Sequence, residues 1–136
     1  MKDLLLNDGN KIPLVGFGTY KLLGQEAVQA VSDALNNDYR LIDTATVYKN
    51  EEAVGLGIKK SGVDRKEISV TTKLWRENLG YNQAKTAFQE SLYKLGLEYI
   101  DMYLIHWPAN AKNYTNWQKA NADAWRAMEE LKADGL

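Results

Sequence analysis

The sequence predicts an α/β protein in which four short strands alternate with four amphipathic helices. Four apolar runs have the length of buried strands, and they span residues 14–18, 40–43, 68–73 and 100–106. Each run is followed by a segment in which apolar residues recur every three or four positions, as they do on one face of a helix. With 136 residues, of which 45% are apolar and 26% charged, the chain has the size and composition of one globular domain.

Residues 1–13 are predicted to form a β-hairpin that caps these repeats. Two short arms, Leu4 to Leu6 and Lys11 to Pro13, flank a turn sequence whose centre is Asp8-Gly9. Asp-Gly favours a two-residue type I′ turn, because both central residues of that turn need a positive φ. Proline cannot donate a hydrogen bond to a ladder, so we expect the second arm to be short or to lie at an edge.

Caps and glycines mark the ends of the predicted helices. The second helix starts at Asn50, a favoured N-cap residue, and has Glu51 in its first turn, where the helix dipole favours an anion. Glycine adopts the left-handed conformation at a helix C-terminus more readily than other residues. Glycines are therefore predicted to end the second, third and fourth helices near Gly62, Gly96 and Gly135.

The spacing of the repeats allows two topologies. The strands begin about thirty residues apart, as expected where eight βα units make a (β/α)8 barrel of about 250 residues. Four units therefore form either the first half of such a barrel or a complete open, doubly wound sheet. The dinucleotide fingerprint G-x-G-x-x-G would favour the open sheet, but Lys21 stands where the glycine after Gly16 and Gly18 is required.

Charge and composition argue against several classes of function. The net charge is −1, from 17 basic and 18 acidic residues with no long run of either sign, so we expect no nucleic-acid or membrane partner. The chain has no cysteine, which excludes a disulfide framework and a thiolate metal site, and we predict no metal. The N-terminal residues include no apolar stretch of signal-peptide length, so a cytoplasmic location is expected.

Titratable side chains stand at the ends of three predicted strands. Asp43 ends the second strand and Tyr48 follows in its loop, Lys73 ends the third strand, and His106, the only histidine, ends the fourth. The carboxyl ends of parallel strands meet at one edge, where α/β enzymes keep their catalytic groups. Side chains alternate along a strand, so Thr71 should share the inner face with Lys73. An inward lysine needs a counter-ion, and Asp43 on the neighbouring strand is the nearest candidate.

Each of these four residues also has an ordinary structural interpretation. Lys73 could extend from a strand end to water, Asp43 could cap a helix, Tyr48 could be a half-buried aromatic residue and His106 a satisfied core histidine. Taken singly, each of these readings is the more common one. The convergence of all four on one end of adjacent parallel strands is what favours a shared chemical role.

Reduction of a carbonyl group would use this set of side chains. Hydride addition to an aldehyde or ketone leaves an alkoxide, so a proton donor must act as the charge develops. We assign that role to Tyr48, because an ammonium group such as that of Lys73 stabilises a nearby phenolate. Asp43 would keep Lys73 charged and in place, and a neutral His106 would donate a hydrogen bond to the substrate oxygen.

A second tyrosine and lysine pair stands near the start of the predicted third helix. Tyr81 and Lys85 are four positions apart, which puts a phenol and an ammonium on one helix face. No serine or glycine-rich loop is near them in the sequence. We therefore interpret this pair as part of a solvated helix start without a catalytic role.

Five segments at characteristic spacings resemble those of a known family. They read GFGTYK, LIDTATVYKNEEAVG, TTKLW, ESLYKLGLEYIDMYLIHWP and ELKADGL, and together they extend over essentially the whole chain. With them the sequence resembles the N-terminal half of an aldo-keto reductase. The resemblance implies the first half of a (β/α)8 TIM barrel, with four βα units over residues 14–136. It also implies an NADPH-dependent reductase of small aldehydes or ketones.

The resemblance carries functional residues onto matching positions of this chain. The family's catalytic tetrad falls on Asp43, Tyr48, Lys73 and His106. Its contacts to the cofactor fall on Gly18, Thr19, Tyr20 and Asp43. Its substrate pocket falls on Tyr20, Val47, Trp75, His106 and Trp107. Many relatives have a tryptophan where this chain has Tyr20, which would change the width and polarity of the pocket.

The resemblance also implies an incomplete cofactor site. The family binds most of NADPH with residues after the fifth strand, and we expect this chain to be truncated before that strand. Three hypotheses follow for the chain. It is a half-barrel fragment of a carbonyl reductase, inactive alone; or it pairs as a homodimer through exposed half-barrel edges, which the missing C-terminal half would otherwise cover; or it is an NADPH-binding module without turnover.

Overall fold

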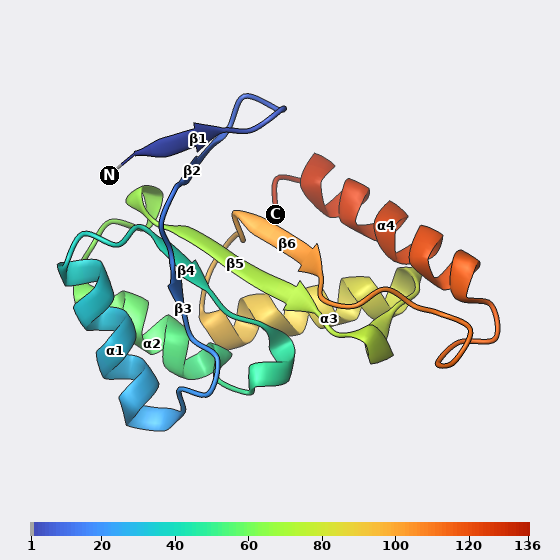
Figure 1. Cartoon of the computed structure of the whole chain (residues 1–136), viewed down its shortest axis with the longest axis horizontal. Helices are drawn as coiled ribbons and strands as arrows, with labels where there is room; N and C mark the ends of the chain where they lie inside the picture. The colour runs from blue at the N-terminus through green and yellow to red at the C-terminus, as the bar shows by residue number, and fades with distance from the viewer. Residues whose placement is uncertain (1) are drawn as a thin grey trace.

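The predicted alternation of strands and helices is confirmed by the computed structural model, which describes residues 2–136. Four parallel strands form one sheet in chain order, and an antiparallel hairpin lies at the end of the sheet where these strands begin (Figure 1). The hairpin strands are β1 (Asp3–Leu5) and β2 (Lys11–Pro13). The sheet consists of β3 (Phe17–Gly18), β4 (Leu41–Asp43), β5 (Ser69–Leu74) and β6 (Met102–Ile105).

Helices follow each strand of the sheet, as the periodicity predicts. The long helices are α1 (Gly24–Asn36), α2 (Glu51–Ser61), α3 (Tyr81–Leu95) and α4 (Trp117–Ala133). Three short 3-10 turns, η1 (Thr46–Tyr48), η2 (Arg65–Glu67) and η3 (Arg76–Asn78), lie in the connections around β4 and β5. The predicted glycine ends are confirmed, because Gly62, Gly96 and Gly135 all have positive φ.

The first strand is shorter than its apolar run predicts. Only Phe17 and Gly18 pair with β4, and β3 has no neighbour on its other side among the described residues. Leu14 and Val15 precede β3 and are 53% and 49% exposed. The apolar side chains at the start of this run are therefore only partly buried by the sheet.

The core lies between the sheet and the helices that cover one of its faces. Alternation along β5 decides which side chains enter it: Val70 and Leu74 are fully buried against the helices, while Thr71 shares the other face with Lys73, as predicted. On β6, Tyr103 packs edge-on against Phe88 of α3. The main cluster comprises Val31, Leu35, Ile42, Val54, Ile58, Ile68, Val70, Phe88, Leu92, Leu95, Ile100 and Leu131.

The hairpin turn differs from its prediction. The backbone N–H of Leu6 donates to the carbonyl of Asn10 and that of Gly9 donates to the carbonyl of Leu6, which leaves a three-residue loop. Gly9 has a φ of 86°, whereas Asp8 stays at negative φ, so the predicted two-residue type I′ turn is wrong. The Asp8 carboxylate instead accepts the backbone N–H and the side-chain amide of Asn10. Met1, which the predicted cap includes, lies outside the described residues.

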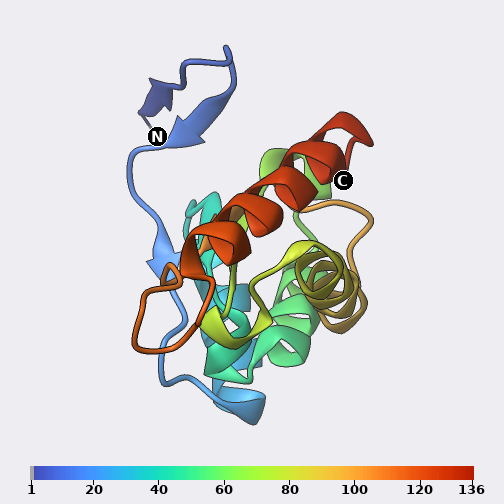
Figure 2. The same ribbon diagram turned by 90° about the vertical axis from the view of Figure 1, so that its right-hand side faces the viewer.

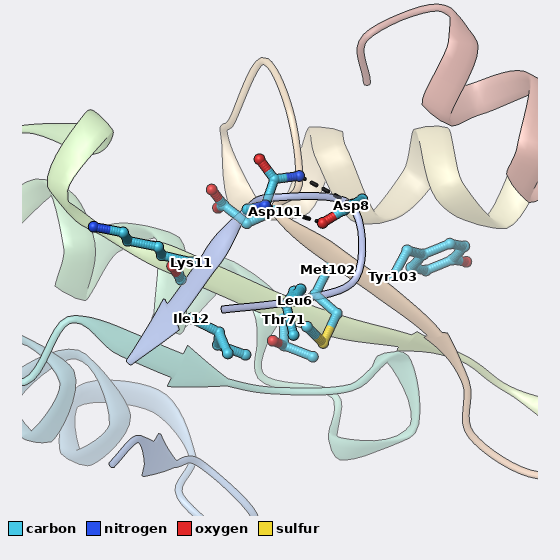
Figure 3. Close-up of a pocket in the computed structure, with 10 residues that line it drawn as sticks. Leu6, Asp8, Lys11, Ile12, Thr71, Asp101, Met102 and Tyr103 are labelled. Carbon is cyan, nitrogen blue, oxygen red and sulfur yellow. Dashed lines mark hydrogen bonds between the residues drawn. The ribbon is translucent and has the colours of Figure 1, made fainter. Parts of the chain in front are cut away.

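A cavity of about 430 Å³ lies between the hairpin loop and the amino ends of β5 and β6 (Figure 3). Leu6 and Ile12 of the hairpin face Thr71 and Met102 of the sheet across it. Figure 2 shows the hairpin on the far side of the sheet from most of the helices, and α4 packs against α3. The Lys132 ammonium on α4 lies 2.9 Å from the Asp8 carboxylate and ties the two elements together.

None of the helices in residues 2–136 combines the length and the apolar character that crossing a membrane would require. The longest of them, α4, has 17 residues. Its exposed face carries charged side chains such as Lys119 and Arg126, which lie within 4 Å of the Asp123 carboxylate.

We predict that Gly55→Ala destabilises the protein. A Cβ atom at Gly55 would lie 2.1 Å from the Leu95 carbonyl oxygen, so α2 and α3 would have to separate. We expect the free energy of unfolding to fall by about 1–3 kcal/mol, although alanine favours an unconstrained helix over glycine by about 1 kcal/mol. Urea denaturation followed by circular dichroism measures this change.

The matched control for that substitution is Lys59→Ala, which removes an exposed side chain from the same helix. We expect it to change the free energy of unfolding by no more than about 0.5 kcal/mol. A Gly55→Ala protein as stable as the unsubstituted chain would contradict the close packing of α2 against α3.

Candidate active site

The four predicted site residues lie at the carboxyl edge of the sheet. Asp43 is the last residue of β4, Lys73 is the last but one of β5, and His106 follows β6 directly. Tyr48 ends η1, the turn that follows β4. The edge is opposite to the end where the hairpin lies (Figure 1). Strand topology alone therefore brings the four positions to one end of the molecule.

Lys73 and Asp43 form a half-buried ion pair across β4 and β5. The Lys73 ammonium lies 2.7 Å from a carboxylate oxygen of Asp43, and it also donates to the Thr44 carbonyl at 2.8 Å. The Lys73 side chain is 13% exposed and that of Asp43 is 38% exposed. Because an ammonium withdrawn from water needs its hydrogen bonds satisfied, these two acceptors hold Lys73 in one position.

Tyr48 lies against both Lys73 and His106. The Lys73 ammonium is 5.2 Å from the centre of the Tyr48 ring, and the His106 ring centre is 5.7 Å from it at an interplanar angle of 85°. On its other side Tyr48 meets Tyr20, with ring centres 5.1 Å apart. A cation, a phenol and an imidazole thus share one contact region.

Two effects lower the pKa of His106 below that of a free histidine. The larger is burial, which disfavours the charged imidazolium, and the second is repulsion by the Lys73 ammonium. The Asp43 carboxylate opposes them by favouring the charged form. His106 is therefore neutral near pH 7, and its buried Nδ1 has no hydrogen-bond partner within residues 2–136.

Aromatic side chains lie beside this group, among them three that the sequence assigns to a substrate pocket. Trp75, just beyond β5, packs its indole edge-on to the His106 imidazole, with ring centres 5.3 Å apart. Tyr20 and Trp107 are 65% and 58% exposed, so large apolar surfaces border the site. Val47 is half-buried on η1, next to Tyr48 in the chain.

The predicted cofactor positions lie at the end of β3, beside Asp43. Thr19 is fully buried, and both its backbone N–H and its hydroxyl donate to the Asp43 carbonyl, at 3.0 and 3.1 Å. Its polar groups therefore serve the protein's own structure. Gly18 faces open space, because a Cβ atom built there would meet no atom within 4 Å. Together with the exposed Tyr20 ring, it leaves an accessible surface next to the ion pair.

Asn50 has a structural role that the sequence prediction missed. It occupies the N-cap position of α2, but its side chain makes no capping hydrogen bond. Its amide instead donates to the carbonyls of Thr19 and Leu22 at 2.8 and 2.9 Å, and its oxygen accepts the Thr44 hydroxyl at 2.8 Å. Asn50 thus ties the loops after β3 and β4 to α2. The only sequence signal was an amide next to Glu51, which equally indicates a cap.

The Tyr81 and Lys85 pair lies on α3 and connects it to α4. The Tyr81 hydroxyl donates to the Glu130 carboxylate, and the Lys85 ammonium lies 3.2 Å from the same oxygen. Arg126 covers the Tyr81 ring, with its guanidinium carbon 4.7 Å from the ring centre. These contacts make the pair a link between helices rather than a merely solvated helix start.

The arrangement suits proton transfer more than metal chemistry. Within the described part of the chain, no group of three or more histidine, cysteine, aspartate or glutamate side chains is placed to hold a metal ion. The carboxyl edge instead presents one phenol beside one ammonium, with a neutral imidazole facing them. Such a set can donate a proton and a hydrogen bond to an oxygen atom on which negative charge develops.

We predict that the NMR titration of His106 reports the Lys73 charge. The chain has one histidine, so its ring-proton signal is free of overlap. The midpoint should lie below that of a free histidine. It should move upward in Lys73→Met, because this substitution removes the ammonium whose repulsion lowers the pKa of His106. Lys119→Met, which changes a lysine with a 72% exposed side chain on α4, is the control and should leave the midpoint in place. A downward or absent shift in Lys73→Met would contradict the electrostatic coupling.

Comparison with known proteins connects this site to one family. Residues 14–136 match the aldo/keto reductase family. Glyoxal reductase from Bacillus subtilis (strain 168) is 47% identical, over 99% of this chain and 47% of its own length. Morphine 6-dehydrogenase from Pseudomonas putida is 46% identical, over 96% of this chain and 42% of its own.

Solved structures agree in fold as well as in sequence. The aldo/keto reductase from Brucella melitensis superposes with a TM-score of 0.89 and 48% identity, and the match covers 98% of this chain and 50% of that one. The aldo-keto reductase from Bombyx mori, solved in complex with NADP, superposes with a TM-score of 0.87 and 41% identity over 99% and 48% of the two chains. The chain spans about half the length of the relatives it matches, and its hairpin and four βα units correspond to half of their TIM barrel. The sequence identity and the structural similarity both extend over nearly the whole chain. Together with the family match, they show that the chain belongs to the aldo/keto reductase family.

Proposed function

We propose that this chain carries the proton-transfer site of an NADPH-dependent carbonyl reductase. The observation that carries the proposal is the 2.7 Å pair of Lys73 and Asp43 beside the Tyr48 ring. A lysine held charged next to a phenol is what a tyrosine acid requires. Membership of the aldo/keto reductase family supports the same reaction class.

Tyr48 is the general acid in this proposal. Its hydroxyl donates a proton to the carbonyl oxygen as negative charge develops there, and the Lys73 ammonium stabilises the phenolate that remains. Asp43 keeps the ammonium in place through the ion pair. His106 is neutral, so one ring nitrogen can donate a hydrogen bond; Nδ1 is buried, which leaves Nε2 to orient the carbonyl oxygen.

The residues present fit one end of a nicotinamide cofactor. Gly18 leaves open space at the end of β3, and the 65% exposed Tyr20 ring offers an apolar surface beside Asp43. Thr19 would border the cofactor without donating to it, since both its backbone N–H and its hydroxyl donate to the Asp43 carbonyl. When bound, NADPH would supply the hydride. A relative solved with NADP supports this choice of cofactor.

Small aldehydes and ketones are the proposed substrates. The pocket borders on Trp75, Trp107 and Tyr20, which together offer flat apolar surfaces around a few polar groups. The relative from Bacillus subtilis bears the name glyoxal reductase, and a relative from Salmonella typhimurium bears the name methylglyoxal reductase. Both names refer to small dicarbonyl compounds, and these are the first substrates to test.

We further propose that the chain is a single unit, a hairpin cap over residues 1–13 and four βα repeats over 14–136, whose cofactor site needs additional strands. In the described residues the outer edges of β3 and β6 are both unpaired, and Leu14, Leu104 and Trp107 near them are at least 40% exposed. Unpaired strand edges flanked by apolar side chains favour pairing with another chain. The remaining half of a barrel or a second copy of this chain would supply the strands.

The catalytic assignment can be tested in a chimera that joins this chain to the C-terminal half of Bacillus subtilis glyoxal reductase. We expect the chimera to consume NADPH with glyoxal or methylglyoxal. Tyr48→Phe should lower kcat by about 10²–10⁴-fold, because the proton donor is lost. The loss of NADPH absorbance measures the rate, and circular dichroism verifies the fold.

Tyr93→Phe is the matched control for that substitution. It removes the same hydroxyl from a side chain that is 86% exposed on α3, and the rate should not change. An active Tyr48→Phe chimera would rule out Tyr48 as the acid. Tight NADPH binding without turnover in the unsubstituted chimera would instead favour a binding module.

Self-association of the isolated chain is a separate expected outcome. If the open edges of β3 and β6 pair between copies, light scattering should give a mass of twice the 15.4 kDa of one chain. Leu104→Lys, which places a charge beside the β6 edge, should shift the protein toward monomer. Lys59→Glu on α2 is the control. A monodisperse monomer at all concentrations would contradict pairing between copies.

A further inference from the structure

A hollow beside the candidate site has a cationic and amide lining. Its volume is about 590 Å³, and it lies between η3, just past the end of β5, and the loop that follows β6. The lining side chains are Arg76, Glu77, Asn110, Lys112, Asn113 and Tyr114. No residue of the proposed proton-transfer group contributes to it, so the hollow is a neighbouring space with its own chemistry.

Trp75 connects the hollow to the proposed reaction site. The guanidinium carbon of Arg76 lies 5.2 Å from the centre of the Trp75 ring, and that ring lies 5.3 Å from the His106 ring. Arg76 and His106 are therefore separated by one indole.

The charged side chains of the hollow form no ion pairs with the protein. Among the ion pairs found in residues 2–136, none includes Arg76, Lys112 or Glu77. Two cations and one anion face the space, which leaves it positive. A guanidinium presents N–H groups in a planar fork that matches the two oxygens of a carboxylate or phosphate.

The loop that carries Lys112 is held in place by hydrogen bonds. The Asn121 side chain on α4 accepts the Ala109 N–H at 2.8 Å and donates to the Ala109 carbonyl at 3.0 Å. Within the loop, the Asn110 side chain accepts the backbone N–H of Lys112 at 2.9 Å, and the Asn110 carbonyl accepts that of Tyr114 at 3.0 Å. The backbone of the loop is thus ordered without a ligand, so that a ligand would have to order only exposed side chains such as Arg76 and Lys112.

We propose that this hollow binds the anionic end of the substrate, so that the preferred substrates are aldehydes or ketones bearing a carboxylate or phosphate. The carbonyl group lies at Tyr48 and His106, the body of the molecule lies along Trp75, and the anionic group bonds to Arg76 with Lys112 beside it. The position of the carbonyl rests on the carbonyl-reductase function proposed above. The anion site rests only on the hollow and its charges.

NMR titration of the full chain tests both ends of such a ligand without requiring turnover. The ring-proton signal of His106, the only histidine, reports the carbonyl end, and the side-chain N–H signal of Arg76, assigned by its loss in Arg76→Gln, reports the anionic end. The probes are 4-carboxybenzaldehyde, its neutral methyl ester and 4-formylphenyl phosphate. The last of these distinguishes phosphate from carboxylate.

We expect the charged aldehydes to shift both signals and to bind about three- to tenfold more tightly than the ester. Arg76→Gln should remove that advantage, and Lys112→Gln should reduce it. Lys59→Gln, an exposed lysine on α2, is the matched control and should leave all three affinities unchanged. Equal affinity of the acid and the ester, or an advantage that survives Arg76→Gln, would overturn the anion site.

The two reporters separate this inference from the proposed function. If the ester and the acid shift His106 equally and Arg76 not at all, the anion site fails while a carbonyl site remains. If only Arg76 responds to the charged probes, the anion site holds and the carbonyl position at His106 fails. If neither signal moves with any probe, both assignments fail.

Discussion

The half-buried pair of Lys73 and Asp43 is the interaction on which the carboxyl edge of the sheet depends. The Lys73 side chain is only 13% exposed, so its ammonium needs a counter-ion and acceptors within reach. Asp43 supplies the charge from the adjacent strand, and Thr44 supplies a carbonyl. The pair joins the ends of β4 and β5, which are neighbouring strands of the sheet. Tyr48 packs there because its ring meets the cation on one side and His106 on another.

The N-terminus of α2 stabilises that edge through hydrogen bonds to the strands and loops beside it. At the start of α2, Asn50 joins the loops after β3 and β4, and the next residue, Glu51, accepts the Thr72 hydroxyl at 2.7 Å from inside the core. Glu51 is only 3% exposed and Thr72 is fully buried. One helix terminus therefore contacts the three strands or loops that carry or border the site. Such support matters because a proton donor must be held to within a fraction of an ångström.

This chain contains more of the proposed substrate-binding residues than of the proposed cofactor-binding residues. The phenol, the imidazole and the Arg76 hollow all follow β4, β5 and β6, and of these β4 and β5 are paired on both sides. The predicted cofactor contacts follow β3, which is paired with one neighbour only, over Phe17 and Gly18. An edge strand leaves its outer hydrogen-bonding groups without partners. The open side of β3 is thus where additional structure would have the largest effect.

The sequence by itself determined the alternation of strands and helices and the placement of Asp43, Lys73 and His106 at strand ends, because both follow from local periodicity and from the direction of parallel strands. Local pattern could not decide how side chains are shared between distant segments. Asn50 looked like a helix cap, yet its amide bonds the Thr19 loop; Gly9 alone, without Asp8, takes the positive φ of the hairpin turn. The hollow at Arg76 forms only because the segments that follow β5 and β6, which are distant in the sequence, lie side by side. Tertiary structure decided these features because each depends on partners more than twenty residues away or on the backbone geometry that packing selects.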